Sequence, residues 1–396
     1  MGATTTSYNT RRAALQENRQ KSLQKSWLMR SPPSGRREAP SSALFRQNRQ
    51  GHPPQGVSPA GGLRMLQDYE HEPVMVDEVV AAFREVPPGT VVDATVGGGG
   101  HASALLDANR HLRVIGIDRD PAAVSAARAK LAAYGDRARV RQSRFDALAD
   151  VASSEGVRDG ELSGVLFDLG MSSAQLASTD RGFSYRHDGP LDMRMDPSDP
   201  GSPTAAELLN NLPEGQLARM LASNGEGRGS SRLARRLVAR RPYSTTEQLA
   251  DAVRDAIPPS ARRRGHPAAR VFQALRIAVN DELEQLADVL PQAVVALRPR
   301  GRCVTIAYHS GEDRIVKAAF AEAETGGCAC PPGLPCACGA VPLGRVLTRG
   351  ARKPSAEEVQ RNSRAASARL RVFVRNDSDP HMSAASNVTP GPGSAA

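Results

Sequence analysis

Thr90-Val-Val-Asp-Ala-Thr-Val-Gly-Gly-Gly-Gly-His-Ala102 is the stretch from which the fold class of this 396-residue chain can be inferred. Val91 and Val92 end a short apolar run that is typical of a buried strand. Gly97 to Gly100 predict a turn, and the apolar spacing from Ala102 to Leu106 predicts the start of a helix. A strand, a glycine turn and a helix form the first unit of a doubly wound α/β sheet, whose ligand lies beyond the carboxyl end of the strand.

Asp93 distinguishes between the two cofactor classes that such a turn binds. Gly97-x-Gly99-x-x-Ala102 matches the dinucleotide pattern, although a match of this kind is weak by itself. Asp93 stands four residues before Gly97, where a dinucleotide-binding strand usually carries an apolar residue. A carboxylate there suits a cation such as S-adenosylmethionine, and Asp-x-x-x-Gly-x-Gly resembles the first motif of S-adenosylmethionine-dependent methyltransferases. A glycine-rich surface loop without a ligand is the alternative.

The composition favours a polyanionic partner such as nucleic acid. The net charge is +10, and 47 of the 52 basic residues are arginine, which binds phosphate with two parallel hydrogen bonds. A GC-rich genome would produce the same bias. No apolar region follows Met1 and no stretch approaches about 18 apolar residues, so we expect neither a signal peptide nor a membrane span. A cytoplasmic location with reduced cysteines follows as an expectation.

Residues 1–70 are expected to be a disordered basic extension. They carry eleven Lys or Arg against four Asp or Glu, are rich in Ser, Pro, Gln and Gly, and lack apolar periodicity. A basic arm and untranslated sequence upstream of a start at Met65 both fit this segment. The tail 376–396, rich in Ser, Pro, Gly and Ala, is also expected to be disordered.

The second and third strands should supply the adenosine contacts. Leu112 to Asp118 predicts a strand whose final carboxylate lies 21 residues beyond Gly97, near the spacing expected for an acid that accepts the ribose hydroxyls. Asp120 is expected to cap the next helix. Val140 to Phe145 predicts the third strand, and Phe145 either stacks on the adenine or belongs to the core.

Asp168 ends the predicted fourth strand and is the candidate for binding an amine substrate. In amino-group methyltransferases this position faces the transferable methyl group. An exocyclic amine is a poor nucleophile because its lone pair is delocalised into the ring, and a hydrogen-bond acceptor on the amine can localise that pair. Asp168 and the carbonyl groups of the following loop are suitable acceptors.

Residues from about 180 to 290 interrupt the α/β alternation with helical spacing. Helices are predicted over 205–209, 216–221, 232–238, 246–256 and 271–289. Arginines crowd onto this segment, so we expect an RNA surface, although such runs are often only solvated faces. The candidates for phosphate contact are Arg235, Arg236, Arg240, Arg270 and Arg276.

The last part of the chain returns to strand pattern and contains a cysteine cluster. Residues 301–309 predict a strand that ends at His309, which either contacts the substrate base or caps the next helix. Residues 370–375 predict the closing strand. Four cysteines, Cys328, Cys330, Cys336 and Cys338, suggest zinc, but Cys-x-Cys differs from the usual Cys-x₂₋₄-Cys spacing of structural zinc sites.

Several motifs together resemble the MraW family of bacterial ribosomal RNA small subunit methyltransferases. They are Asp168-Leu-Gly-Met-Ser-Ser, Arg181-Gly-Phe-Ser-Tyr, Asp188-Gly-Pro-Leu-Asp-Met-Arg-Met-Asp196, residues 266–280 and Tyr308-His-Ser-Gly-Glu-Asp, within a resemblance that runs from His71 to about Arg375. The resemblance implies N4-methylation of a cytidine in the decoding region of 16S rRNA, with S-adenosylmethionine as cofactor and the small ribosomal subunit as partner.

The resemblance also implies particular cofactor contacts. These are Gly99, Gly100, His101, Asp118, Phe145, Asp168 and Gln175, of which His101 and Gln175 rest on the resemblance alone. The chain departs from the family pattern at Gly227 and Gly229, where the family usually has an acid and an aromatic residue.

We therefore predict a doubly wound, Rossmann-like methyltransferase domain over residues 71–180 and 290–375, with a helical insert over 181–289 that recognises RNA. A DNA cytosine-N4 methyltransferase is the nearest alternative, but it would normally carry an Asn/Ser/Asp-Pro-Pro-Tyr loop where this chain has Asp168-Leu-Gly-Met. A ribosome-assembly factor that binds RNA without catalysis is the alternative from another class. A nicotinamide oxidoreductase is disfavoured by Asp93.

Overall fold

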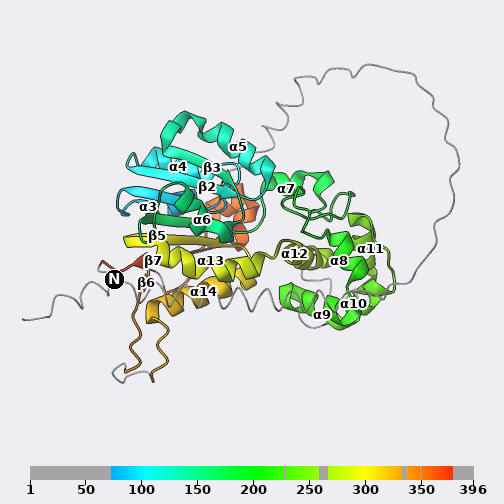
Figure 1. Ribbon diagram of the computed structural model, residues 1–396. Helices are drawn as coiled ribbons and strands as arrows, with labels where there is room; N and C mark the ends of the chain where they lie inside the picture. The colour runs from blue at the N-terminus through cyan, green and yellow to red at the C-terminus, as the bar shows by residue number, and fades with distance from the viewer. Residues whose placement is uncertain (1–72, 227–228, 258–265, 332–336, 348, 378–396) are drawn as a thin grey trace, which may run out of the picture. The chain divides into compact units, whose positions relative to one another are not determined.

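The computed structural model describes residues 73–226, 229–257, 266–331, 337–347 and 349–377, all within one compact unit (Figure 1). The segment 1–70 and nearly all of the tail 376–396, both expected to be disordered, lie outside the described residues. None of the helices in the described ranges is long and apolar enough to cross a membrane.

A seven-stranded sheet with the order β3-β2-β1-β4-β5-β7-β6 forms the centre of the fold. Strands β1 to β5 are parallel, and β7 is antiparallel to both β5 and β6. The strand order reverses between β1 and β4, which is where ligands bind in doubly wound sheets. The strands are β1 (Gly89–Asp93), β2 (Leu112–Asp118), β3 (Ala138–Gln142), β4 (Leu162–Asp168), β5 (Leu297–Ala307), β6 (Gly344–Val346) and β7 (Arg369–Arg375).

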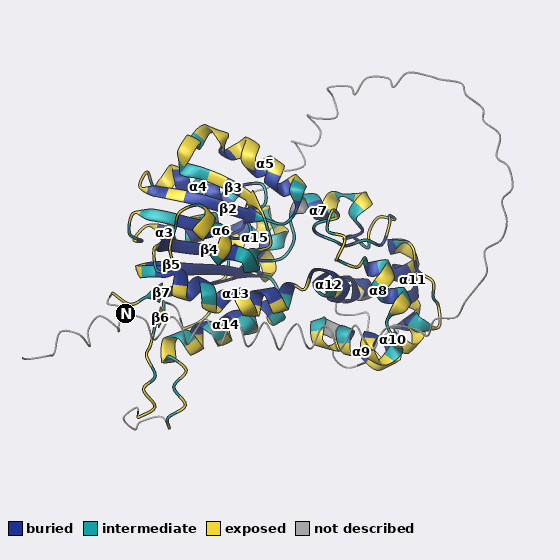
Figure 2. Cartoon of the chain, in the orientation of Figure 1, coloured by how far each residue is buried: buried dark blue, intermediate teal, exposed yellow. Residues whose placement is uncertain are grey.

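Helices cover both faces of the sheet because its central strands are apolar on both sides. Val91 packs into a cluster with α3 and α4, whereas its neighbour Val92 packs into a cluster with α6, α13 and α14. Figure 2 shows the central strands as buried between these helical layers. The first layer contains α3 (Val76–Phe83), α4 (Gly100–Ala108), α5 (Pro121–Leu131) and α15 (Ala356–Arg361), and the second contains α6 (Leu148–Ser154), α13 (Glu282–Ala296) and α14 (Ser310–Thr325).

The expected helical insert is present and has a hydrophobic core of its own. Leu209, Leu217, Leu237, Val253 and Leu275 are buried in this core, one from each main helix. The capping boxes of α8 and α11 match their sequences, Thr-x-x-Glu and Thr-x-x-Gln. The insert helices are α8 (Ala205–Asn211), α9 (Glu214–Leu221), α10 (Ser230–Val238), α11 (Thr246–Ala256) and α12 (Pro267–Asn280), and the short α7 (Ser173–Ala177) precedes the insert in the loop after β4.

The helix predicted over 271–289 is in fact two helices. Asp281 adopts a left-handed φ of 52°, which ends α12 and begins α13. The apolar side chains of α12 belong to the insert core, whereas those of α13 pack on the sheet. We therefore propose that the insert ends at Asp281 rather than at residue 289.

The third strand is shorter than predicted, and it forms one edge of the sheet. β3 ends at Gln142, and Phe145 begins the short helix η2 (Phe145–Ala147). Only Val140 is buried in β3, and Arg139 and Arg141 are exposed on either side of it. At the opposite edge, β6 has three residues, with the exposed Arg345 in the middle.

Candidate active site

The glycine turn after β1 brings the backbone close to the end of β2. Gly97 adopts a φ of 51°, which glycine allows without strain, and its N–H donates to Asp118 Oδ2 at 3.0 Å. A Cβ atom on Gly100 would lie 2.3 Å from Pro73 Cγ, so the first turn of α4 has no room for a side chain there. The turn therefore depends on glycine at both positions.

A cavity of about 390 Å³ lies at the carboxyl ends of β1, β2, β4 and β5, within the range typical of small-molecule sites. Two residues expected at the cofactor, Gly99 and Asp93, do not line it. The missing side chain of Gly99 faces Leu131 of α5, and Asp93 is buried beneath the cavity floor. The other candidates do line it: Gly100, His101, Asp118, Phe145, Asp168, Gln175 and His309.

Asp118 lies at the end of β2 with its carboxylate held by the backbone. Its Oδ1 accepts from the N–H of Asp120 at 2.9 Å, and its Oδ2 accepts from Gly97. Burial raises the pKa of Asp118 to about 6, and these N–H groups lower it only in part. Each carboxylate oxygen keeps a second lone pair, so both can accept a ligand hydroxyl.

Asp93 is a buried carboxylate with an unsatisfied oxygen. Its side chain is 1% exposed, Oδ1 accepts from the N–H of Thr95 at 3.3 Å, and Oδ2 has no hydrogen-bond partner among the described residues. Burial raises the pKa of Asp93 to about 7, and the charge of His101 counteracts part of that rise. Asp93 therefore carries its full negative charge only well above pH 7, so the carboxylate expected beside a cationic ligand is partly protonated at neutral pH in the ligand-free protein.

Asp168 is contacted by two side chains that control its orientation. The hydroxyl of Tyr308 donates to Asp168 Oδ1 at 2.7 Å, and His101 Nδ1 lies 3.6 Å from Asp168 Oδ2. Since His101 Nε2 is 2.9 Å from the carbonyl of Val74, which can only accept, we assign a proton to Nε2. Burial raises the pKa of Asp168, and His101 and Tyr308 oppose that rise. Burial also raises the pKa of Tyr308 well above its usual value, so Tyr308 stays a donor.

His309 caps α14 while it lines the cavity. Its Nδ1 accepts from the N–H groups of Gly311 and Glu312 at 3.1 and 3.4 Å. In return, Glu312 Oε2 accepts from the N–H of His309 at 3.2 Å. The capping role expected as one of two alternatives is therefore confirmed, and a contact between His309 and a substrate base remains a prediction.

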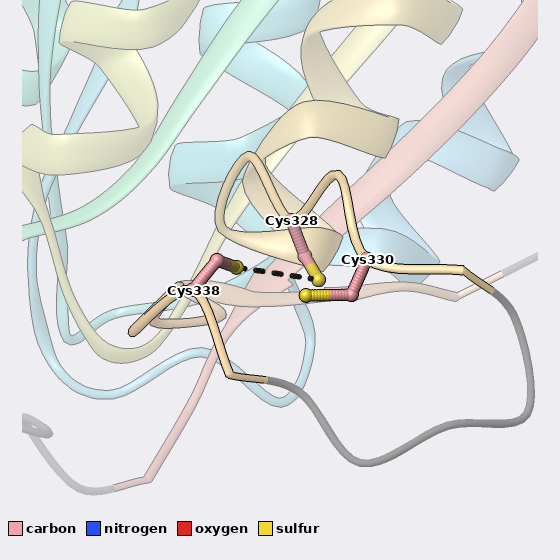
Figure 3. Close-up of side chains that lie close together, drawn as sticks. All are labelled: Cys328, Cys330 and Cys338. Carbon is pink, nitrogen blue, oxygen red and sulfur yellow. Dashed lines mark hydrogen bonds between the residues drawn. The ribbon is translucent and has the colours of Figure 1, made fainter.

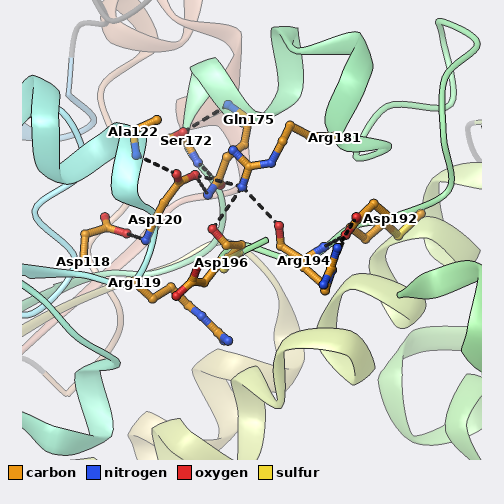
Figure 4. Close-up of polar contacts among 12 residues, drawn as sticks. Asp118, Arg119, Asp120, Ala122, Ser172, Gln175, Arg181, Asp192, Arg194 and Asp196 are labelled. Atoms are coloured by element: carbon orange, nitrogen blue, oxygen red, sulfur yellow. Dashed lines mark hydrogen bonds and ion pairs between the residues drawn. The ribbon is translucent and has the colours of Figure 1, made fainter. Parts of the chain in front are cut away.

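A buried network fixes the loop after β4 to the end of β2 (Figure 4). Asp120, which is fully buried, caps α5 through Ala122 as expected, and its Oδ2 accepts from Gln175 Nε2 at 2.8 Å and from Arg181 at 3.1 Å. Gln175 Oε1 accepts from the N–H of Ser172 at 3.0 Å. A cofactor contact by Gln175 would therefore use its second amide hydrogen or the second lone pair of Oε1.

The insert supplies another part of the cavity wall, including Met195, Arg276 and Asn280. Asn280 Oδ1 accepts from the N–H of Met195, and its Nδ2 donates to the carbonyl of Met193, both at 2.8 Å. Arg276 is 7% exposed and both its Nε and one terminal nitrogen lie 2.9 Å from Glu282. Arg276 is therefore not part of an exposed basic surface, because its guanidinium group is buried and paired.

The other candidate arginines are exposed on the insert. Arg235 of α10 and Arg240, just after that helix, lie 3.4 and 2.8 Å from Glu214 and Asp255. Arg236 donates to the last carbonyl groups of α11 and so caps that helix. Arg270 of α12 is also exposed. Phosphate contacts by these four residues remain a prediction.

The departure from the family pattern coincides with the start of α10. Gly229 precedes the helix with a φ of 104°, a conformation that an aromatic residue would adopt only under strain. Gly227 lies outside the described residues. Glycine at 229 therefore fits the backbone of this chain.

Sequence reasoning missed Tyr308 and Asn280. Tyr308 could have been found from its position two residues after Ile306. Asp168 pairs with Ile306, and side chains two residues apart lie on the same face of the sheet, so Tyr308 lies on the same face as Asp168. Asn280 gave no local signal, since its partners Met193 and Met195 are more than eighty residues away.

Sequence comparison shows which known proteins this chain is similar to. The model of the MraW methylase family matches residues 68–376. A ribosomal RNA small subunit methyltransferase H from Heliobacterium modesticaldum is 48% identical over 310 residues, which cover 77% of this chain and 98% of that relative. The protein of the same name from Mycobacterium sp. (strain KMS) is 48% identical over 316 residues, which cover 77% of this chain and 84% of the relative.

Proposed function

The chain belongs to the MraW methylase family, and we infer that it transfers a methyl group from S-adenosylmethionine to N4 of a cytidine in the decoding region of 16S rRNA. The arrangement of Asp118 and Asp168 around one cavity, at the ends of the two strands β2 and β4 that flank β1, is the observation that carries this function. We further propose that the protein acts in the cytoplasm, where small ribosomal subunits are assembled.

The cavity has the groups that S-adenosylmethionine needs. Asp118 would accept the ribose hydroxyls, and Phe145 would pack on the adenine. The glycine turn would let the methionine part approach the backbone, above the unsatisfied carboxylate oxygen of Asp93. When bound, S-adenosylmethionine supplies a methyl group activated by a positively charged sulfur.

Asp168 is proposed to hold the cytosine amine. A carboxylate that accepts an amine hydrogen localises the nitrogen lone pair, and the raised pKa of Asp168 makes it a better acceptor for the proton that the methylated amine releases. Tyr308 keeps the carboxylate in one orientation through its 2.7 Å hydrogen bond. Most of the rate enhancement would come from alignment inside a site that excludes water.

The target base must leave its stack to reach Asp168, because the acid lies inside the cavity rather than on the surface. We propose that the exposed arginines of α10 bind RNA phosphates around the extruded nucleotide. The buried Leu233 and Leu237 anchor this helix in the insert core, so its arginines project from a fixed element.

The direct test is methylation of small ribosomal subunits that lack this modification, with tritiated S-adenosylmethionine as donor. Nuclease digestion and mass spectrometry should locate the label on N4 of a single cytidine of 16S rRNA. Asp168→Ala should lower turnover at saturating cofactor by about a hundredfold or more. Labelling of duplex DNA in preference to the subunit, or cofactor binding without any transfer, would contradict the proposed function.

A further inference from the structure

The loop between α14 and β6 holds a cluster of thiols that the methyl transfer does not use. Gly326 ends α14, and a Cβ atom on it would lie 2.4 Å from the carbonyl carbon of Val341, so the two arms of the loop meet at a narrow neck. The N–H of Leu343 donates to the carbonyl of Ala323 at 2.9 Å across the same neck. Beyond it, Cys328, Cys330 and Cys338 point toward one another (Figure 3).

The separation of the sulfur atoms fits a shared metal ion better than a disulfide. All three Sγ atoms lie within 4.8 Å of one another, and those of Cys328 and Cys338 are 3.6 Å apart. A disulfide would require about 2.05 Å. Two thiolates bound at about 2.3 Å to one tetrahedral zinc ion lie about 3.8 Å apart, which is close to the distance found here.

The unusual Cys-x-Cys spacing is explained by the fold of the loop. Cys328 and Cys330 come from the outgoing arm of the loop and Cys338 from the returning arm. The cluster therefore joins the two arms beyond the neck and does not form within one short motif. The three sulfur ligands therefore converge from two segments, as they do in zinc sites built from paired knuckles.

The loop has little else to stabilise it. None of its described residues from 326 to 343 is buried, and the whole stretch carries no charged side chain. A loop without a hydrophobic core or ion pairs gains stability from a metal cross-link, as small metal-binding domains do.

We propose that Cys328, Cys330 and Cys338 bind one Zn²⁺ as thiolates, with the thiol protons released to solvent and a fourth position taken by another ligand. Zinc is the choice because thiolates are its preferred ligands at structural sites and because it is not redox-active. Cys336 lies outside the described residues and is not needed for the proposal.

The site is structural and separate from the cavity. Glu312, in the first turn of α14, lines the cavity, while the cluster follows the last turn. The 16 residues of α14 span about 24 Å, so the ion would not reach the substrate. It would instead fix the loop that leads into the three-residue edge strand β6.

The test is the metal content of the full-length chain, produced with added zinc and purified under reducing conditions without chelator. We expect about one zinc ion per chain by elemental mass spectrometry, and close to none in Cys328→Ser/Cys338→Ser. Cys303→Ala is the matched control, because Cys303 is a buried cysteine of β5 outside the cluster, and it should keep its zinc.

Two further measurements keep the test independent of folding defects and of activity. Cobalt added to the metal-free wild-type chain should give the absorption of a thiolate-bound tetrahedral ion, and a chelator should release zinc while circular dichroism stays constant. Hydrogen exchange of β6 should become faster after the release. A wild-type chain that binds no zinc under reducing conditions, equal zinc loss in Cys303→Ala, or an intact mass showing a disulfide within the cluster would overturn the proposal. Cofactor binding would be unaffected by any of these results, so they leave the proposed function standing.

Discussion

The cofactor contact of Asp118 and the amine contact of Asp168 can be tested separately at saturating cofactor, although Asp168 is also an expected cofactor contact. Asp118 lies at the end of β2 and Asp168 at the end of β4, and each has its own hydrogen-bond partners. Substitution of Asp118 should therefore change mainly the cofactor affinity, whereas substitution of Asp168 should change mainly the turnover.

The affinity for S-adenosylmethionine should depend on the ionisation of Asp118. Burial raises the pKa of Asp118 to about 6, so the carboxyl group of the ligand-free protein is protonated below that pH and ionised above it. Because the ionised form accepts both ribose hydroxyls, affinity should rise as the pH increases through 6 and fall by up to about tenfold for each unit below it. Titration calorimetry between pH 5 and 8 measures this dependence.

Asp118→Asn provides the control for that profile. It should bind about 10- to 100-fold more weakly at pH 8 and lose the dependence around pH 6. A dependence that persists near pH 7 belongs to Asp93, whose pKa is about 7. An unchanged midpoint near pH 6 in the variant would remove Asp118 from the ribose site.

Tyr308→Phe should affect turnover more than cofactor binding. The variant loses the hydrogen bond that orients Asp168, which should lower kcat by about tenfold or more and change the KM for S-adenosylmethionine little. The same bond holds the pKa of Asp168 down, so the acidic limb of the pH–rate profile should move to higher pH. Tyr134→Phe is the matched control, since Tyr134 donates to Asp107 at 2.8 Å outside the cavity. Equal loss in both variants would mean that Tyr308 acts only on stability.

At the scale of elements, local patterns predicted most helices and every strand except the short β6, but not the break at Asp281. The apolar spacing continues from α12 into α13, so nothing in the periodicity marks the left-handed residue between them. The break is held by Asn280, whose backbone carbonyl also accepts from Arg119 at 2.9 Å. In the same way, β3 ends at Gln142 because its partner strand β2 ends at Asp118. The residues of β3 themselves do not show where this pairing ends.

Asn280→Ala should weaken both the fold and the site. The variant leaves the N–H of Met195 and the carbonyl of Met193 without their partners inside the protein, which costs about 2–4 kcal/mol of unfolding free energy. Urea denaturation followed by circular dichroism measures the loss, and the KM for S-adenosylmethionine should rise as well.

Asn210→Ala tests whether the second effect is specific. Asn210 makes two similar hydrogen bonds to the backbone of Tyr243, at 2.8 and 2.9 Å, and it does not line the cavity. Asn210→Ala should lower the free energy of unfolding and leave the KM for S-adenosylmethionine unchanged. If Asn280→Ala binds the cofactor normally, Asn280 serves only to join the insert to the sheet.

At the scale of the whole molecule, the sheet positions the cavity, and the insert carries the exposed arginines that are proposed to bind RNA. Asp118 and Asp168 could be identified from the sequence because strand ends in a doubly wound sheet meet at one edge. The insert was visible as a change of periodicity, but which of its arginines are exposed depends on packing. Arg276, between the apolar Leu275 and Ile277, turns inward to Glu282, while Arg235 and Arg240 turn outward from a basic segment.

Neutralising the outward arginines should weaken RNA binding and its salt dependence. Arg235→Gln/Arg240→Gln should reduce the slope of log affinity against log salt by about 0.7–0.9 for each phosphate group that the protein no longer neutralises. Arg158→Gln is the control, because Arg158 is 87% exposed in a loop far from the insert in sequence. Filter binding of 16S rRNA at several salt concentrations gives the slopes. Equal slopes in the wild type and the double variant would mean that Arg235 and Arg240 contact solvent and not RNA phosphates.

The two edge strands of the sheet affect the tendency of this chain to aggregate at high concentration. The outer side of an edge strand has unpaired N–H and C=O groups, to which a second copy of the protein can add a strand of its own. Arg139 and Arg141 flank the single buried residue of β3, and β6 offers only three residues around Arg345. Charged side chains at one edge, where Arg139 and Arg141 are paired with Asp136 and Glu155, and the shortness of the strand at the other edge oppose such growth. The fold therefore resists aggregation by features that take no part in catalysis.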